Sequence, residues 1–183
     1  MRKMVSGCVP LALGFALLLL AGCIAPNPRQ VPPAAQVRFR VFNTVEMKPV
    51  TLSAAFVMAR ANQRALKKID GVLTRGMQTV FSNLVLLDPT EDFSQTHVRT
   101  LLVSPVVTEV RLSGSKSAPL QGKGMVEGSD VTLQVTFRDS ASGKVVAAPE
   151  FYRSADSAEG GAADDRMLED LASDVVQYCS NNW

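Results

Sequence analysis

The chain has 183 residues, with 19 Lys and Arg against 17 Asp and Glu. Residues 1–22 hold Arg2 and Lys3 but no acid, so removing them leaves 161 residues (183 minus 22) with 17 charges of each sign. Balanced charge argues against a nucleic-acid-binding protein, which would carry a strong cationic excess. It also argues against long-range attraction to an anionic membrane. The remaining length fits one domain with its own core.

The N-terminal segment has the three-part layout of a secretory signal peptide. Arg2 and Lys3 precede an apolar run from Val9 to Leu20, which two small residues follow. That run is 12 residues long, whereas a membrane-spanning helix needs about 20 apolar residues. We therefore predict that residues 1–22 are a cleaved signal peptide and not a permanent membrane span.

The segment ends in Leu20-Ala21-Gly22-Cys23, which resembles the lipobox of bacterial lipoproteins. The resemblance implies that a diacylglycerol alkylates the Cys23 thiol, that the chain is cut between Gly22 and Cys23, and that the new amino group is then acylated, for example by palmitate. Only a thiol is a good enough nucleophile for this step. The alternative is an ordinary signal peptide in which a cysteine falls by chance.

The residue after the cysteine is Ile24 and not an aspartate. In the lipoprotein family an aspartate there favours retention at the inner membrane, so the resemblance implies delivery to the outer membrane, with the protein facing the periplasm. The inner membrane and the cell surface stay open as alternatives.

Of the three cysteines, Cys8 lies in the predicted signal peptide and Cys23 would carry the lipid. Cys179 then has no partner for an intramolecular disulfide, so we expect no covalent staple in this fold. Because Cys179 follows Tyr178 near the end of an expected helix, we interpret it as a small buried or half-buried residue and not as a reactive thiol.

Residues 24–35 (IAPNPRQVPPAA) contain four prolines and little that could enter a core. With the lipidated cysteine they are predicted to form a tether over residues 23–35, and the folded domain is predicted to occupy residues 36–183. In polyproline geometry the 12 residues after the cysteine would reach up to about 35 Å.

The first half of the domain is predicted to contain a strand, a long helix and a short buried strand. Val37, Phe39 and Val41 alternate with arginines, which is typical of a half-buried strand. Residues 85–89 (VLLDP) are the predicted short strand. Between Thr51 and Leu84, with an earlier turn over 54–61, apolar residues recur in steps of three and four and predict one helical face: Leu66, Ile69, Leu73, Met77, Val80 and Leu84.

The predicted long helix contains two glycines and a row of cationic residues. Gly71 and Gly76 each cost about 1 kcal/mol relative to alanine, so we expect a break near Asp70-Gly71 or close packing there. The predicted charged face is a candidate for binding a phosphate or an acidic partner, although a solvated helix face is the favoured interpretation. Its cations are Arg64, Lys67, Lys68 and Arg75.

The second half is predicted to be mainly β-structure followed by a helix. The run 98–112 predicts a strand with Val106, Thr108, Val110 and Leu112 on one face, and Pro105 is expected at an edge, a bulge or a strand start. Strict alternation over 131–138 and the loop DSASG predict an antiparallel hairpin within 129–154.

Asp164 is expected to cap the terminal helix, with acids at its start to suit the helix dipole. Its predicted inner face is Met167, Leu168, Leu171, Val175 and Tyr178. The element order predicts an α+β fold: a single small domain whose largely antiparallel sheet carries the long helix and the C-terminal helix mostly on one face.

The sequence gives little support for metal, nucleotide or serine-triad chemistry. His97 is the only histidine, no G-x-S-x-G elbow is present, and we interpret His97 as a loop residue. The glycines Gly122, Gly124 and Gly128 precede a strand, whereas a phosphate-binding loop precedes a helix, so they are interpreted as a flexible loop. No cofactor and no metal site are predicted.

Carboxylate pairs are what a glycosidase would need. The local candidates are Glu91 with Asp92, Glu127 with Asp130, and Asp164 with Asp165. All lie in expected loops or at a helix start, where solvated or capping acids are normal. Aromatic residues make up 6% of the chain, with one tryptophan, which is little material for stacking on sugars. A hydrolase is therefore an alternative and not the preferred hypothesis.

The stretch from Arg99 to Asn182 resembles small Gram-negative lipoproteins of unknown function that combine a Pro-rich tether with a compact α/β domain. A fainter resemblance, in element order alone, is to periplasmic domains of the LpoB, CsgG and TolB amino-terminal kind, and it implies action through protein contacts. We therefore expect a non-enzymatic binding or assembly module of the cell envelope, with an envelope protein as partner and no nucleic acid. The alternatives are a small cell-wall hydrolase and a lipid or small-ligand carrier, which would need a sizeable apolar cavity in its core.

Overall fold

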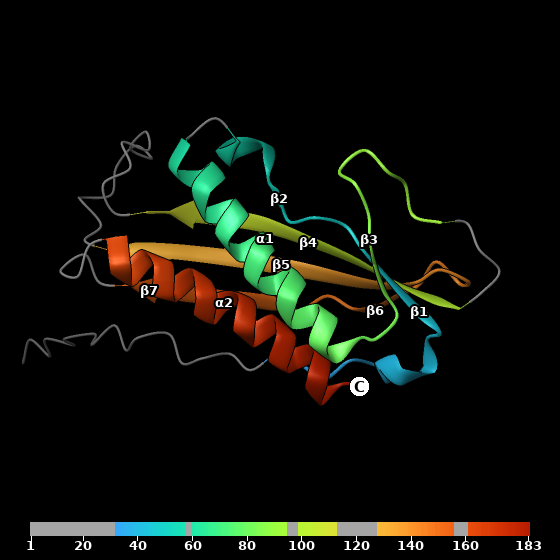
Figure 1. Cartoon of the computed structure of the whole chain (residues 1–183). Coiled ribbons are helices and arrows are strands. Elements are labelled where there is room, and N and C mark those ends of the chain that lie inside the picture. The colour runs from blue at the N-terminus through green and yellow to red at the C-terminus, as the bar shows by residue number, and fades with distance from the viewer. Residues whose placement is uncertain (1–31, 58–59, 95–98, 113–127, 156–160) are drawn as a thin grey trace, which may run out of the picture. The chain divides into compact units, whose positions relative to one another are not determined.

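The computed structural model describes residues 32–57, 60–94, 99–112, 128–155 and 161–183 (Figure 1). The chain divides into two compact units, residues 1–30 and 31–183, and the described residues all belong to the second. This unit holds the whole hydrophobic core that the structure describes. No helix in the described part of the chain is long and apolar enough to cross a membrane.

A seven-stranded mixed sheet carries two long helices on one face, which confirms the predicted α+β fold (Figure 1). The strands are β1 (Thr44–Met47), β2 (Thr51–Leu52), β3 (Leu84–Leu86), β4 (Thr100–Arg111), β5 (Ser129–Asp139), β6 (Val145–Ala147) and β7 (Glu150–Ala155). The helices are α1 (Arg60–Val80) and α2 (Gly161–Asn181), with short 3-10 helices η1 (Phe39–Val41) and η2 (Ala54–Phe56).

The sheet has the order β3-β1-β4-β5-β6, with β2 beside β4 and β7 beside β5. The long central pair β4–β5 is antiparallel, as are β5–β6 and β5–β7. The pairs β1–β3, β1–β4 and β2–β4 are parallel. The predicted hairpin is confirmed, since β5 turns at residues 139–143 into β6. Gly143 has a φ of 66°, a conformation that side chains other than glycine rarely adopt.

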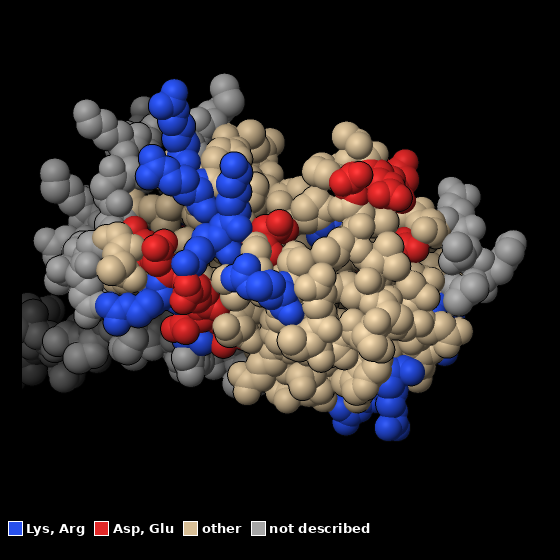
Figure 2. Space-filling view, in the orientation of Figure 1, with Lys and Arg blue, Asp and Glu red and all other residues tan. Residues whose placement is uncertain are grey.

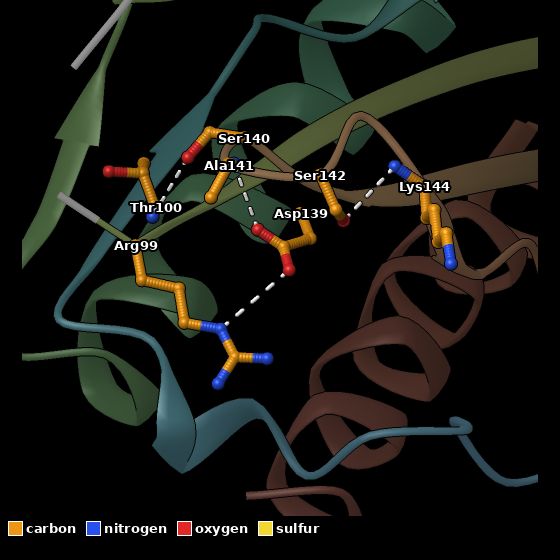
Figure 3. A network of polar contacts seen from close by, with 7 residues as sticks. All are labelled: Arg99, Thr100, Asp139, Ser140, Ala141, Ser142 and Lys144. Carbon is orange, nitrogen blue, oxygen red and sulfur yellow. Dashed lines mark hydrogen bonds and ion pairs between the residues drawn. The ribbon is translucent and has the colours of Figure 1, made fainter. Parts of the chain in front are cut away.

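The turn of this hairpin is closed by polar contacts that also hold the start of β4 (Figure 3). The buried Asp139 carboxylate accepts a hydrogen bond from the Ala141 amide at 2.9 Å and lies 3.6 Å from the Arg99 guanidinium. The Thr100 amide donates to the Ser140 hydroxyl at 3.0 Å, and the Ser140 amide donates to the Thr100 carbonyl at 2.9 Å. These contacts are structural, because they join the start of β4 to the end of β5 and to the turn that follows it.

The strand predicted around Val37, Phe39 and Val41 is wrong. Phe39 begins η1, and the first strand starts at Thr44. The Phe39 amide donates to the Asn182 carbonyl at 2.7 Å, and the Phe42 amide donates to the Phe39 carbonyl at 3.0 Å, so the backbone of η1 does not form a strand of the sheet. Phe39 is fully buried and stacks on Phe137 with 4.7 Å between ring centroids.

Strand β4 confirms the predicted strand but not the predicted face. The register against β5 shifts between Val107 and Glu109, so a bulge places both Val107 and Val110 in the core. Pro105 lies where the neighbouring strand changes from β1 to β2. The Val135 amide opposite Pro105 donates to Pro149 on the other side, so the missing proline N–H falls in the gap between β1 and β2 and breaks no ladder.

Three smaller expectations also need correction. The predicted buried strand is β3, whose Val85 and Leu86 are 45% and 44% exposed. The terminal helix begins at Gly161, so Asp164 lies in its first turn, where an acid suits the dipole, and is not the cap. Helix α1 runs unbroken through Gly71, and the close contact of this helix lies at Gly76 instead.

Helices α1 and α2 bury one face each against the sheet. The predicted inner face of α2 is buried along its whole length, and α1 buries Ala65, Ile69, Leu73 and Met77. The two helices approach closely, because a Cβ built on Gly76 would lie 2.4 Å from the nearest methyl group of Val176. Position 76 of α1 therefore requires glycine, because the packing against α2 leaves no room for a side chain there.

We predict that Gly76→Ala lowers the free energy of unfolding, whereas Gly71→Ala raises it. Three side-chain atoms of Val176 lie within 3.3 Å of a Cβ built on Gly76, and rotation of the β-branched Val176 side chain cannot move all three away from it. Overpacking of about 1–3 kcal/mol then exceeds the helix-propensity gain of about 1 kcal/mol. At Gly71 the nearest atom is the end of the Arg75 side chain at 3.6 Å, so only the gain remains.

Urea unfolding of residues 31–183 measures both changes. Gly71→Ala is the matched control, because both glycines lie inside α1. Combining Gly76→Ala with Val176→Ala is expected to recover part of the loss. Equal effects of the two alanine substitutions would contradict the close contact.

Candidate functional site

Several residues singled out in the sequence lie outside the described residues. They are Gly22, Cys23, His97, Gly122, Gly124 and Glu127. Their predicted roles stay predictions. Within the part of the chain that the structure describes, no group of three or more His, Cys, Asp or Glu side chains is arranged to hold a metal ion.

The described acids from the candidate pairs have ordinary surroundings. Glu91 and Asp92 are exposed, the Glu91 carboxylate accepts a hydrogen bond from the Asp88 amide at 3.2 Å, and Asp92 lies 3.8 Å from the Lys48 ammonium. Asp165 is exposed in the first turns of α2. These positions are those of loop and helix-start acids, as the sequence predicts.

Asp130 is the exception, because it is a buried acid on the sheet. Its Oδ1 atom lies 3.2 Å from the Arg111 guanidinium and forms an ion pair with it, but the geometry is not that of a hydrogen bond. Burial raises the pKa of Asp130, and the neighbouring Arg111 lowers it, with the net shift upward. This arrangement is an ion pair between the paired strands β4 and β5, and its predicted companion Glu127 lies outside the described residues.

Cys179 is fully buried, as predicted, and burial raises the pKa of its thiol well above the usual range. The reactive form of a cysteine is the thiolate, so this environment makes the sulfur inert. Cys179 therefore belongs to the core and not to a site.

The cationic face of α1 meets an acidic face of α2. Arg64, Lys67 and Arg75 are exposed, whereas the Lys68 ammonium lies 2.6 Å from the Glu169 carboxylate. This hydrogen bond raises the pKa of Lys68 and lowers that of Glu169. Figure 2 shows the blue and red side chains gathered side by side over the N-terminal halves of both helices. The charges of the helix face are thus partly matched within the domain.

Beyond these charges the two helices form an open groove of about 670 Å³. We call it the α1–α2 groove, and its lining is Val72, Gly76, Thr79, Val80, Ser173, Val176, Gln177, Ser180 and Trp183. Its floor is the close contact between Gly76 and Val176. At one end the Trp183 indole, 42% exposed, meets the Phe81 ring edge-on with 5.1 Å between centroids.

Most residues that line the groove, all except Val72 and Ser173, come from two stretches without charged side chains. The stretches Gly76–Leu87 and Val175–Trp183 contain none, and we call these two stretches together the uncharged end. Figure 2 shows a tan surface over the C-terminal ends of the two helices, bordered by blue side chains. Both charge-free stretches can be seen in the sequence. Neither stretch alone indicates that the fold places the two side by side.

The N-terminal part of the described chain is fastened beside the same region. The Tyr178 hydroxyl donates to the Pro33 carbonyl at 3.1 Å, and the Ala35 amide donates to the Asn182 side chain at 2.9 Å. The Arg38 guanidinium donates to the Asn181 carbonyl at 2.7 Å. Among the described residues, hydrogen bonds to α2 thus start at Pro33, which lies inside the predicted tether.

No family model matches the sequence, and no curated protein matches it. Several solved structures share its fold. A PelC dodecamer from Paraburkholderia phytofirmans superimposes with a TM-score of 0.53 at 15% sequence identity, covering 81% of this chain and 96% of that one. A DUF330-family protein from Xanthomonas campestris superimposes with a TM-score of 0.50 at 13% identity, covering 86% and 90%.

Lipoproteins are among the similar structures. One is a minor lipoprotein from Acinetobacter baumannii, with 15% identity and coverage of 75% of this chain and 93% of that one. Its TM-score is 0.35, which is too low to support a conclusion about this chain. At these identities the likeness shows the fold alone.

We predict that the thiol of Cys179 is unreactive in the folded domain. In residues 31–183 it is the only cysteine, and its burial and raised pKa should slow its reaction with Ellman's reagent at pH 8 by at least about 100-fold relative to the chain in 6 M guanidinium chloride. The absorbance of the released thiolate measures the rate. Equal rates in the folded and unfolded chain would place Cys179 at the surface and contradict the packing of α2.

Proposed function

We propose that this protein is a lipid-anchored envelope protein, held in the outer membrane through Cys23, whose domain is a non-enzymatic binding or assembly module facing the periplasm. The observation that supports the proposal is that two features lie close together in the domain. The α1–α2 groove and the segment that leads toward Cys23 lie at the same end of α2. An anchor joined to this segment would keep the groove near the membrane.

The physical advantage of such an anchor is local concentration. A short flexible linker gives an effective concentration around millimolar between tethered partners. Weak contacts made by a shallow, open groove are then sufficient. The similar PelC structure is a dodecamer, which offers one precedent for assembly through copies of a domain with this fold.

The placement of the described acids supports a binding module over a cell-wall hydrolase. Glu91 and Asp92 are exposed loop residues, and Asp130 is committed to Arg111. A carrier of lipid or small ligands was expected to hold a sizeable apolar cavity in its core. The α1–α2 groove is instead open at the surface, which favours contact with another macromolecular surface.

We predict that Cys23→Ser abolishes both processing and membrane retention of the full chain. Serine lacks the nucleophilic thiol that the lipid attachment needs. Cell fractionation followed by intact-mass measurement tests this, with the wild-type chain carrying the acyl mass. Cys179→Ala is the control, since a buried cysteine should not change the location. A Cys23→Ser chain that matures and stays in the membrane fraction would refute the anchor.

We also predict that residues 31–183 release no soluble fragments from purified peptidoglycan. A muramidase acting on the same preparation provides the positive control. The test that separates the alternatives adds His97→Ala, Glu91→Ala, Asp92→Ala and Glu127→Ala to the same assay. Turnover by the wild-type domain that any one of these changes abolishes would replace the binding module with the hydrolase.

A further inference from the structure

Charge is segregated along α2. Its acids lie on the N-terminal side, with Asp174 the last of them before nine residues without a charged side chain, which are Val175–Trp183. Asp174 is itself matched by the Arg153 guanidinium, which donates to it at 2.6 and 2.7 Å. Helix α2 ends at Asn181, and at 1.5 Å per residue it continues for about 10 Å beyond Asp174. Trp183, which follows the helix, is therefore set apart from the acids of α2.

The uncharged end has the side chains that suit a lipid headgroup region. Trp183 presents part of its indole, and amphipathic aromatic rings favour the level of the headgroups. Around it lie hydroxyl, amide and aliphatic groups such as Thr79, Val80 and Gln177. Neutral polar groups of this kind keep their hydrogen bonds among headgroups.

Two cations flank the uncharged end. Arg38 and Arg40 are exposed in and beside η1, and Arg38 reaches the Asn181 carbonyl near the end of α2. In Figure 2 blue side chains border the lower edge of the uncharged surface. Arginine near an anionic leaflet is attracted to it within a Debye length.

The length of chain before the domain limits how far this surface can lie from the anchor. Cys23 is nine residues before Pro32, the first described residue, and an extended chain of that length reaches about 28 Å. Pro33 and Ala35 are hydrogen-bonded to the C-terminal end of α2, so the described chain enters the domain beside the uncharged end. The opposite, charged half of α2 is farther along the helix axis.

We propose that the uncharged end, with Trp183 at its centre and Arg38 and Arg40 at its rim, is a bilayer-contacting surface that seats on phospholipid headgroups. This inference rests on the proposed anchor at Cys23. The lipid then holds the chain to the membrane, and the surface sets the orientation of the domain. A second copy of the chain seated on the same groove is the competing occupant.

Chemical coupling tests this surface independently of lipidation in the cell. Residues 23–183 are coupled through Cys23 to a maleimide lipid in vesicles of phosphatidylethanolamine and phosphatidylglycerol. Cys179 is buried with a raised pKa and should not compete. Trp183 is the single tryptophan, so its fluorescence reports on this end alone. A failure of this vesicle experiment would not change the outcome of the Cys23→Ser experiment in cells. A failure of the Cys23→Ser experiment would not change the outcome in vesicles.

With brominated phospholipid in the vesicles, Trp183 emission is expected to fall at least about twofold and to shift to shorter wavelength. The matched control is a chain with Trp183→Phe and Tyr152→Trp. Tyr152 is 49% exposed, and its neighbour Phe151 faces the core, so position 152 points to the other face of the sheet. Emission from position 152 should stay unquenched. Equal quenching at both positions, or none at Trp183, would overturn the proposal.

Two further measurements complete the test. Arg40→Gln should weaken the quenching of Trp183 in anionic vesicles and leave it unchanged in vesicles of phosphatidylcholine with the maleimide lipid, whereas Arg64→Gln, which removes an exposed charge from α1, should change neither. If Arg40→Gln and Arg64→Gln have the same effect, the rim plays no part and the proposal fails. A change in Trp183 emission with protein concentration in the absence of vesicles would assign the surface to a second copy instead.

Discussion

Asn182 is the residue through which the two ends of the domain are joined. It is 5% exposed, and its groups bind in three directions. Its side-chain oxygen accepts from the Ala35 amide at 2.9 Å, its side-chain nitrogen donates to the Tyr178 carbonyl at 2.8 Å, and its carbonyl accepts from the Phe39 amide at 2.7 Å. A buried amide with every group paired contributes specificity as well as stability, because any other partner arrangement leaves a group unsatisfied. The path of the segment before η1 follows from this one residue.

The aromatic core depends on the same junction. With its amide held by Asn182, Phe39 enters the core and contacts the rings of Phe81, Phe137 and Tyr178 at centroid distances of 4.7 to 6.4 Å. Phe81 in turn supports Trp183 at the surface. A fully buried aromatic side chain of this size stabilises a fold by several kcal/mol, as the cost of about 3–5 kcal/mol for its replacement by alanine indicates. The polar junction thus positions the hydrophobic contacts, and these contacts position the exposed indole.

The sequence predicted the elements whose pattern is local. The hairpin around Val131–Phe137 and the inner face of α2 follow from alternation and from steps of three and four, and burial in the structure agrees with both. The strand expected at Phe39 failed because its amide is used by Asn182, 143 residues away in the chain, and no local pattern contains that partner. The face of β4 failed because a bulge after Val107 shifts the alternation by one residue.

The candidate site illustrates the same limit. The charge-free run at Val175–Trp183 is visible in the sequence, and so is Gly76, but the groove exists only because Gly76 lets α1 approach Val176. Residue identity supplied the surface chemistry, and tertiary packing supplied the shape. Glu91 and Asp92 are adjacent in sequence yet make separate local contacts, which agrees with their interpretation as loop acids.

The arrangement of the domain gives its two sides different roles. Helices α1 and α2 cover one face of the sheet, and in the described part of the chain no helix covers the other. Side chains of β4, β5 and β7 on that second face include Val106, Gln134 and Tyr152, which are partly or largely exposed. An anchored domain seated by the uncharged end would turn the charged half of α1 and α2 away from the bilayer, because charge along both helices increases with distance from that end. Membrane attachment and partner binding would then use separate surfaces, and a lipid on one sulfur would fix where the domain is while the side chains near Trp183 fix which way it faces.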